Sequence, residues 1–142
     1  MIASRFNPYL NLTGGRAIEA LEFYHSVLGG ELEIMTFGQS GMDGPYADQV
    51  MHGRIESEAG YTLMVADAPE EFTQVTPGTN VSLSLSGDAD DADRLRGYFH
   101  ALAEGGEVVE PLRVAPWGDE FGMLVDRFGF SWMVDIGVAP QQ

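Results

Sequence analysis

The chain has 142 residues, of which 44% are hydrophobic, so it is long enough for one compact domain and too short for two ordinary ones. It contains no cysteine, which excludes disulfides, thiolate nucleophiles and cysteine-bound metals and fits a reducing cytoplasm. Because 22 acidic residues outnumber 7 basic ones, for a net charge of −15, the surface would repel nucleic acid and anionic membranes and favours a cationic or neutral partner.

The start of the chain carries no basic apolar leader, because Arg5, Asn7 and Pro8 interrupt its first apolar-rich segment. No apolar run approaches the roughly 20 residues that a membrane-spanning helix needs. We therefore expect a soluble protein that is not exported, does not bind membranes and resides in the cytoplasm.

The first half of the chain predicts one helix among four strands. Apolar and polar residues alternate over residues 6–12, which is typical of a half-buried strand. Its polar face carries Asn7, Tyr9 and Asn11. After the helix, which ends at a Gly-Gly pair, a Gly- and Pro-rich loop separates the second strand from the third. The predicted elements are strand 6–12, a helix within 16–30, strand 31–38, loop 39–49 and two strands within 50–67 joined by a turn at 59–60.

The second half repeats this order, which indicates an internal duplication. Its elements are strand 80–87, a helix within 89–106, strand 107–114 and two strands within 121–137 joined by a turn at 127–129. The matched residues are Asn7 with Asn80, His25 with His100, and Met64 with Met133. We therefore predict an α+β fold of two βαβββ modules, about residues 5–70 and 79–137, within one domain spanning 1–142.

Neither module can bury its sheet alone, so the strands should form one cupped mixed sheet with the helices on the outside. The leucines of the two repeated strands then lie under the helices, and the polar residues between them line the concave side. The residues expected on the concave side of these strands are Asn7, Tyr9, Asn11, Asn80, Ser82 and Ser84. A cleft for a small molecule follows from this arrangement.

Several segments together resemble the vicinal oxygen chelate superfamily, the glyoxalase and bleomycin-resistance group, and within it the PhnB-like branch. They are "PYLNL", "AIEALEFYHSVLGGELEIMTFG", "VMHGRI", "TLMVADAP", "NVSLSLSGD", "LAEGGEVVEPL" and "WGDEFGMLVDRFGFSWMV". They cover most of residues 6–136. The resemblance implies paired βαβββ modules, a cupped sheet and a homodimer.

The resemblance also implies where a metal would bind. In metal-using members, His, Glu or Gln ligands lie at the start of the first strand and the end of the last strand of each module. The matching positions here are Asn7, Met64, Asn80 and Met133. An amide oxygen binds hard ions weakly and a thioether prefers soft copper, so this set does not suit zinc, iron, nickel, manganese or magnesium. We expect no metal at these positions and no cofactor.

His52 has no counterpart in the second half, unlike His25 and His100. Strand alternation places Arg54 and Glu56 on the same face as His52, and Met51, Gly53 and Ile55 on the other. In a cleft His52 would serve as an acid or base; alternatively it packs in the sheet or at a dimer contact. Trp117, on a loop next to Pro116 and Gly118, would cover the cleft and stack on a flat or cationic ligand, or simply pack the loop.

These observations leave three functions open. The first is a protein that binds or sequesters a cationic or neutral organic ligand. The second is a lyase, isomerase or dioxygenase-like enzyme with His52 as base or as part of a non-standard metal site with Glu56. The third is a dimerising or regulatory domain with an unused cleft. Nothing resembles a glycine-rich nucleotide loop, so the methyltransferase label common in the branch is not adopted. The ligand-binding candidates are Asn7, Tyr9, His52, Arg54, Met64, Asn80, Ser82, Trp117 and Met133.

Overall fold

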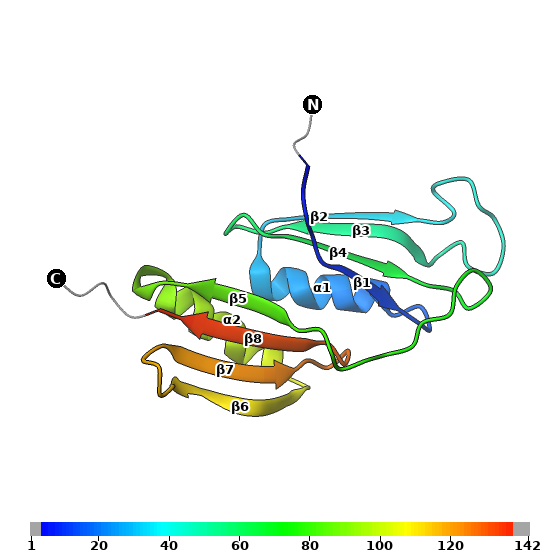
Figure 1. Cartoon of the computed structure of the whole chain (residues 1–142). Helices are drawn as coiled ribbons and strands as arrows, with labels where there is room; N and C mark the ends of the chain where they lie inside the picture. Colours follow the sequence, from blue (N-terminus) through cyan, green and yellow to red (C-terminus); the bar gives the residue numbers. More distant parts are fainter. Residues whose placement is uncertain (1–3, 138–142) are drawn as a thin grey trace. The chain divides into compact units, whose positions relative to one another are not determined.

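The computed structural model describes residues 4–137 and divides into two compact units (Figure 1). The first unit ends at Thr76 and the second begins at Pro77. Each unit carries one βαβββ module, so the predicted α+β class is confirmed. The joining of the two sheets into one cup within one domain stays a prediction. No helix among the described residues is long and apolar enough to cross a membrane.

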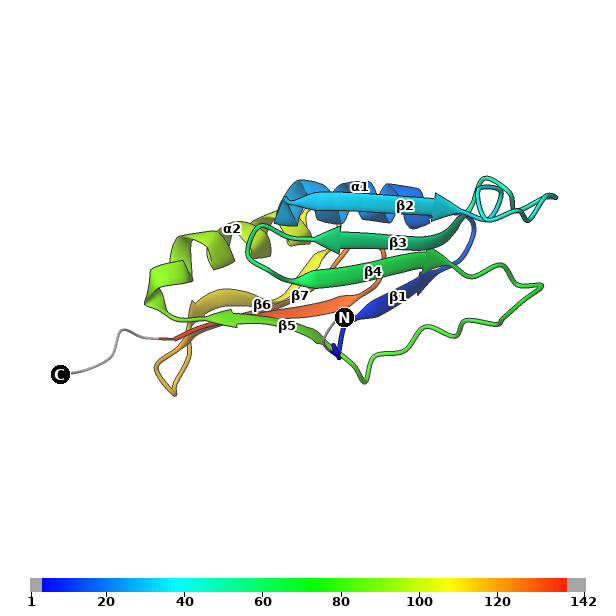
Figure 2. The same ribbon diagram turned by 90° about the horizontal axis from the view of Figure 1, so that it is seen from above.

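The first unit is a four-stranded mixed sheet with one helix on one face (Figures 1 and 2). Its strand order is β1-β4-β3-β2, in which β1 runs parallel to β4 and the other neighbours are antiparallel. The helix connects β1 to β2 across that face. The elements are β1 (Tyr9–Leu12), α1 (Ala17–Leu28), β2 (Glu31–Thr36), β3 (Val50–Glu56) and β4 (Thr62–Asp67).

The second unit has the same topology, with strand order β5-β8-β7-β6 and β5 parallel to β8. A short 3-10 turn, η1 (Ala89–Asp91), precedes its helix. The remaining elements are β5 (Leu83–Gly87), α2 (Ala92–Ala103), β6 (Glu107–Val114), β7 (Glu120–Val125) and β8 (Ser131–Ile136). The predicted order of elements is therefore correct in both halves.

Each core lies between the helix and one face of its sheet. In the first unit Leu21 and Tyr24 of α1 are fully buried, as are Ile55 and Val65 of the sheet. Gly53 allows this contact, because a Cβ at that position would lie 2.3 Å from Leu21 Cδ1. In the second unit Gly122 makes the equivalent approach to Phe99, because a Cβ added to Gly122 would lie 2.8 Å from Phe99 Cε2. We call the sheet face turned away from the helix the open face of each unit.

The strand registers correct one part of the predicted duplication. Met64 lies opposite Tyr9, whereas Met133 lies opposite Ser84. If the two methionines correspond, then Tyr9 corresponds to Ser84 and Asn7 to Ser82, two residues beyond Asn80. The repeated letters "N..L.L" misled the sequence comparison, because alternation with period two matches equally well after a shift of two residues. Common ancestry of the halves stays a prediction.

The first strand of each module also begins later than predicted. β1 begins at Tyr9 and β5 at Leu83, so Asn7 and Asn80 both precede their strands. Asn7 is half-buried and Asn80 is exposed. Pro8 has no N–H to donate to a neighbouring strand. Its carbonyl oxygen accepts a hydrogen bond from the N–H of Met64 at 3.2 Å.

The carboxylate of Asp67, at the end of β4, ties three elements of the first unit together. It is only 5% exposed. Its Oδ1 accepts the backbone N–H of Ala17 at 3.0 Å and its Oδ2 accepts that of Val50 at 2.8 Å. Ala17 is the first residue of α1, where a negative charge is favoured by the helix dipole. Asp67 thus fixes the start of α1 and the start of β3 relative to β4.

Replacing Asp67 by Ala should lower the free energy of unfolding by about 2 to 4 kcal/mol, because two buried N–H donors lose a charged acceptor. Asp67→Asn, which keeps one oxygen acceptor, should lose less. Chemical denaturation measures both changes. Asp43→Ala, at an exposed position of the same unit, is the control and should change stability by less than about 0.5 kcal/mol. Equal stabilities of Asp67→Ala and Asp43→Ala would contradict this role.

Candidate functional site

The open face of the first unit carries four of the nine residues predicted to bind a ligand. The strand registers place Tyr9, Met64, Arg54 and Glu33 opposite one another in a row across the four strands. His52 and Met35 form the neighbouring cross-strand pair. Because side chains opposite each other on paired strands share a face, four predicted residues, Tyr9, His52, Arg54 and Met64, lie on one surface.

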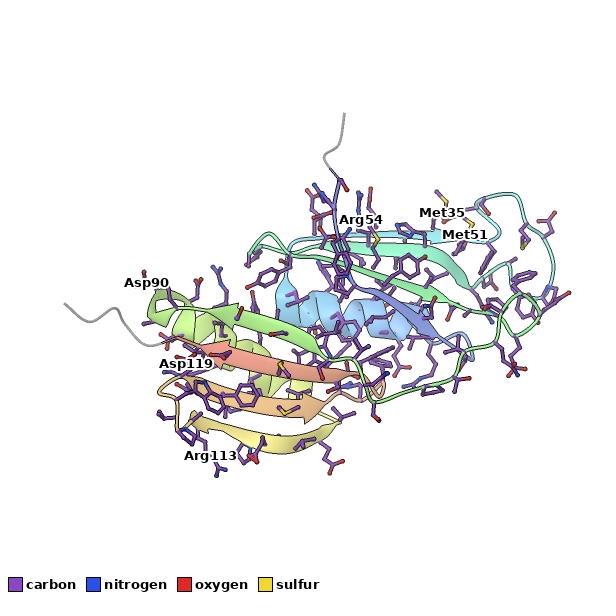
Figure 3. All side chains as sticks on the ribbon, viewed as in Figure 1. Met35, Met51, Arg54, Asp90, Arg113 and Asp119 are labelled. Atoms are coloured by element: carbon purple, nitrogen blue, oxygen red, sulfur yellow. The ribbon has the colours of Figure 1, made fainter. Side chains whose placement is uncertain are left out.

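A β-bulge changes which side chains reach this surface. Met35 pairs with His52, but the next residue, Thr36, pairs with Val50, so Met51 is an extra residue in β3. Val50 is buried, and Met51 and His52 are both half-buried. Figure 3 draws Met35, Met51 and Arg54 on the side of the sheet away from α1. The prediction that Met51 shares the buried face with Gly53 is therefore wrong, because a bulge re-aims one side chain.

His52 contacts Tyr9 on the open face. The Tyr9 hydroxyl oxygen lies 3.5 Å from His52 Nδ1, and the two ring centroids are 5.9 Å apart. The hydroxyl faces one ring nitrogen and so orients the imidazole. This geometry directs the other nitrogen, Nε2, away from Tyr9.

The guanidinium of Arg54 lies among carboxylates. It donates to Glu33, and its Nε is 3.7 Å from Glu56 Oε1. Glu56 also pairs with Arg5 at 3.3 Å and accepts the Thr62 hydroxyl at 2.8 Å. The Nε–H of Arg54 is buried and has no hydrogen-bond partner among the described residues. The positive charge of Arg54 is thus already balanced, while one of its donors is unused.

The open face of the second unit has a different chemistry. Trp117, 63% exposed, lies on the hairpin between β6 and β7 and contacts Phe121 edge to face, with ring centroids 5.5 Å apart. The hairpin is closed by the N–H of Ala115, which donates to the Asp119 carbonyl at 2.7 Å. Phe121 lies opposite Asp135 of β8. Two aromatic rings and two carboxyl groups therefore lie at one end of this sheet, where Figure 3 labels Asp119.

The carboxyl groups of Asp119 and Asp135 interact directly. Burial raises the pKa of Asp135, and a hydrogen bond with Asp119 and the repulsion between the two negative charges raise it further. Asp135 therefore retains its proton at a higher pH than an ordinary aspartate does. A cationic group beside the pair would replace that proton and relieve the repulsion.

Two further predicted residues, Met133 and Ser82, lie in the second unit. Met133 lies on the open face of the second unit, opposite Ser84 and Met123. Ser82 is exposed before β5, with its hydroxyl 2.9 Å from that of Ser131. Sequence reasoning missed the residues that complete each group. They are Met35 and Met51 in the first unit and Asp119 and Phe121 in the second.

The residues at the superfamily's ligand positions do not fit a divalent metal. The predicted positions, Asn7, Met64, Asn80 and Met133, carry two amides and two thioethers, and the strand registers put the Ser82 hydroxyl in place of the Asn80 amide. Either set binds zinc, iron, nickel, manganese and magnesium poorly. Among residues 4–137 no three His, Asp or Glu side chains gather closely enough to hold a metal ion. We therefore derive no chemistry through a metal at these positions.

Comparison with known proteins defines the class. Residues 5–135 match the family described as 3-demethylubiquinone-9 3-methyltransferase. Protein PA1353 from Pseudomonas aeruginosa is 35% identical, with 96% of this chain and all of that chain covered and a TM-score of 0.82. The chain therefore belongs to that family, a PhnB-like branch of the vicinal oxygen chelate superfamily, as the sequence resemblance implies.

Two further solved structures share the fold. A PhnB protein from Bacillus cereus, described as a putative 3-demethylubiquinone-9 3-methyltransferase, is 23% identical, with 94% of this chain and all of that chain covered and a TM-score of 0.71. A member of the glyoxalase, bleomycin resistance protein and dioxygenase superfamily from Sphaerobacter thermophilus is 16% identical, with 94% and 98% covered and a TM-score of 0.56. At these identities the likeness concerns the fold.

Replacing Asp135 by Asn should raise stability at neutral pH. Because the pKa of Asp135 is raised in the folded state, its stabilising contribution is complete below the ordinary aspartate range and is lost as the pH rises through the raised value. Asp135→Asn cannot ionise and so avoids that loss. Its free energy of unfolding should exceed that of the parent at about pH 7, and the difference should vanish near about pH 3. Chemical denaturation at both pH values measures the gain.

Glu120→Gln is the matched control with the opposite sign. The hydrogen bond from Arg96 lowers the pKa of Glu120, so its contribution is present above the ordinary glutamate range and is lost as the pH falls through the lowered value. This variant should lose stability at neutral pH and differ less from the parent in acid. A gain for Asp135→Asn that persists unchanged at about pH 3 would contradict the assignment.

Proposed function

We propose that this protein binds a small organic molecule, cationic or neutral, without a divalent metal, as a binding protein of the glyoxalase and bleomycin-resistance type. The observation that carries the proposal is the contact of the exposed Trp117 ring with the half-buried Phe121 ring, beside the Asp119–Asp135 carboxyl pair. Met133, on the same open face, supplies adaptable apolar lining. These groups recognise a flat body that carries a positive charge.

Physical chemistry favours a cation over an anion here. An exposed tryptophan ring attracts a cation through its negative face, which is worth about 0.5 to 2 kcal/mol depending on desolvation. The carboxyl pair adds opposite charge, and the net charge of −15 raises the local concentration of cations. A planar amidinium or a protonated aromatic amine would satisfy both the rings and the carboxylates.

A second candidate function is acid–base catalysis on the open face of the first unit. It is favoured by the Tyr9 hydroxyl, which orients His52, and by the cationic Arg54, which lies on the same open face. His52 would take or give a proton through Nε2. This candidate covers the lyase, isomerase and dioxygenase-like activities of the superfamily.

We do not propose methyl transfer, although the family description names it. The loop from β1 to α1 holds Gly14 and Gly15, but the first helical amide that follows, that of Ala17, already donates to Asp67. One of the N–H groups that a phosphate would use at this helix N-terminus is thus taken by the protein's own carboxylate.

We also propose, from the superfamily resemblance, that the protein is a cytoplasmic homodimer whose two halves arose by duplication. Sedimentation equilibrium tests the dimer directly. A mass of one chain, 15.4 kDa, at micromolar concentration would rule it out.

Benzamidinium is a suitable probe because it is planar and cationic, and neutral benzamide has almost the same shape. Calorimetry should show benzamidinium binding at least about tenfold more tightly than benzamide. The two probes differ in charge, and the carboxyl pair attracts only the cation. Trp117→Ala should weaken benzamidinium binding about tenfold, which corresponds to about 1.4 kcal/mol of cation–π contact. Phe6→Ala, at a fully exposed aromatic residue of the first unit, is the control. Equal binding of both probes would refute the cationic site.

His52→Ala distinguishes the two candidate functions. If the protein is a binding protein, His52→Ala leaves benzamidinium affinity unchanged, because the groups that bind the cation are the rings of Trp117 and Phe121 and the Asp119–Asp135 pair. If the protein is an enzyme, His52→Ala abolishes turnover in a screen of oxoacids and epoxides while substrate affinity persists. A Tyr9→Phe variant, which keeps the ring, should then reduce turnover without changing stability.

A further inference from the structure

We propose that Met35, Met51 and His52 form a binding site for a soft monovalent metal ion, Cu(I) or Ag(I), on the open face of the first unit. The proposal does not rest on the proposed function, because the organic-cation site lies in the other unit. It also differs from the superfamily's metal site, which involves none of these three positions.

The strand geometry brings the three side chains together. Met35 lies directly opposite His52 on neighbouring antiparallel strands, where Cβ atoms are about 4.5 to 5.5 Å apart. The bulge places Met51, adjacent to His52 in the chain, on the same face. Figure 3 draws the Met35 and Met51 thioethers at the same end of the sheet, on the side away from α1. Met35 is 46% exposed, so an ion can reach it.

The donor set selects a soft ion. Two thioether sulfurs and one imidazole nitrogen suit Cu(I) and its redox-inert analogue Ag(I), whereas magnesium, calcium and manganese prefer oxygen donors. Thioethers are neutral and cannot be deprotonated, so they bind without releasing protons. Because methionine side chains rotate about three bonds, two of them can adjust to the short sulfur–metal distances while the strands stay fixed.

Tyr9 acts as a positioning residue in this site. Its hydroxyl lies 3.5 Å from His52 Nδ1, which leaves Nε2 as the nitrogen that binds the ion. A hydrogen bond on the second ring nitrogen fixes the tautomer and orientation of a metal-binding histidine. Tyr9→Phe should therefore weaken metal binding less than the loss of any of the three ligands does.

Titration of the full chain with Ag(I), and with Cu(I) under anaerobic reducing conditions, tests the site. We expect one equivalent to bind. The volume-conserving Met35→Leu and Met51→Leu variants should each bind the ion at least about tenfold more weakly than the parent. A variant that combines Met35→Leu, Met51→Leu and His52→Asn should not bind it. Met42→Leu, at a similarly exposed methionine, 43% exposed, should bind like the parent. Zn(II) should not compete.

A second measurement needs no variant to fold. In protein with labelled methionine methyl groups, Ag(I) should shift the resonances of Met35 and Met51 and leave that of Met42 unchanged. Uniform small shifts at all methionines, retained affinity in Met35→Leu and Met51→Leu, or Zn(II) binding as tight as Ag(I) would each overturn the proposal.

Discussion

The buried carboxylate of Asp67 is the interaction on which the first unit depends. One charged side chain accepts a backbone N–H from the start of α1 and another from the start of β3. Burying a charge is costly unless it is hydrogen-bonded, and each carboxylate oxygen of Asp67 accepts one backbone N–H. Val50, which donates one of them, immediately precedes the bulged Met51. The same carboxylate therefore holds the helix on the sheet and fixes the strand end that presents Met51 and His52 to solvent.

The two units show how one topology can carry two chemistries. Both have a helix on one face of a four-stranded mixed sheet, and both use a glycine in the third strand, Gly53 or Gly122, to admit the helix. The residue types on the two open faces, in contrast, differ. The first combines an imidazole and balanced ion pairs with its thioethers, and the second combines two aromatic rings, of Trp117 and Phe121, with a pair of carboxyl groups. The scaffold fixes the positions, and the residue types decide the function.

Sequence patterns predicted the elements well because alternation and helical spacing record burial directly. They assigned the wrong face where a β-bulge changes the strand register. The bulge at Met51 has no distinctive residue type, so period two placed Met51 on the wrong face. The asparagine match, Asn7 with Asn80, failed for a related reason, since a shift of two preserves the alternation. The role of Asp67 was invisible because its partners, Ala17 and Val50, are distant backbone amides.

Binding of an organic cation on Trp117 can be followed directly by nuclear magnetic resonance. The chain has two tryptophans, and the indole N–H of buried Trp132 donates to Asp126 at 2.8 Å, while Trp117 is exposed. Two-dimensional nitrogen–proton spectra resolve the two indole signals during a titration with benzamidinium. If the cation binds on Trp117, the Trp117 signal shifts saturably and the Trp132 signal stays in place. Saturable binding that leaves the Trp117 signal unmoved would contradict binding at that ring.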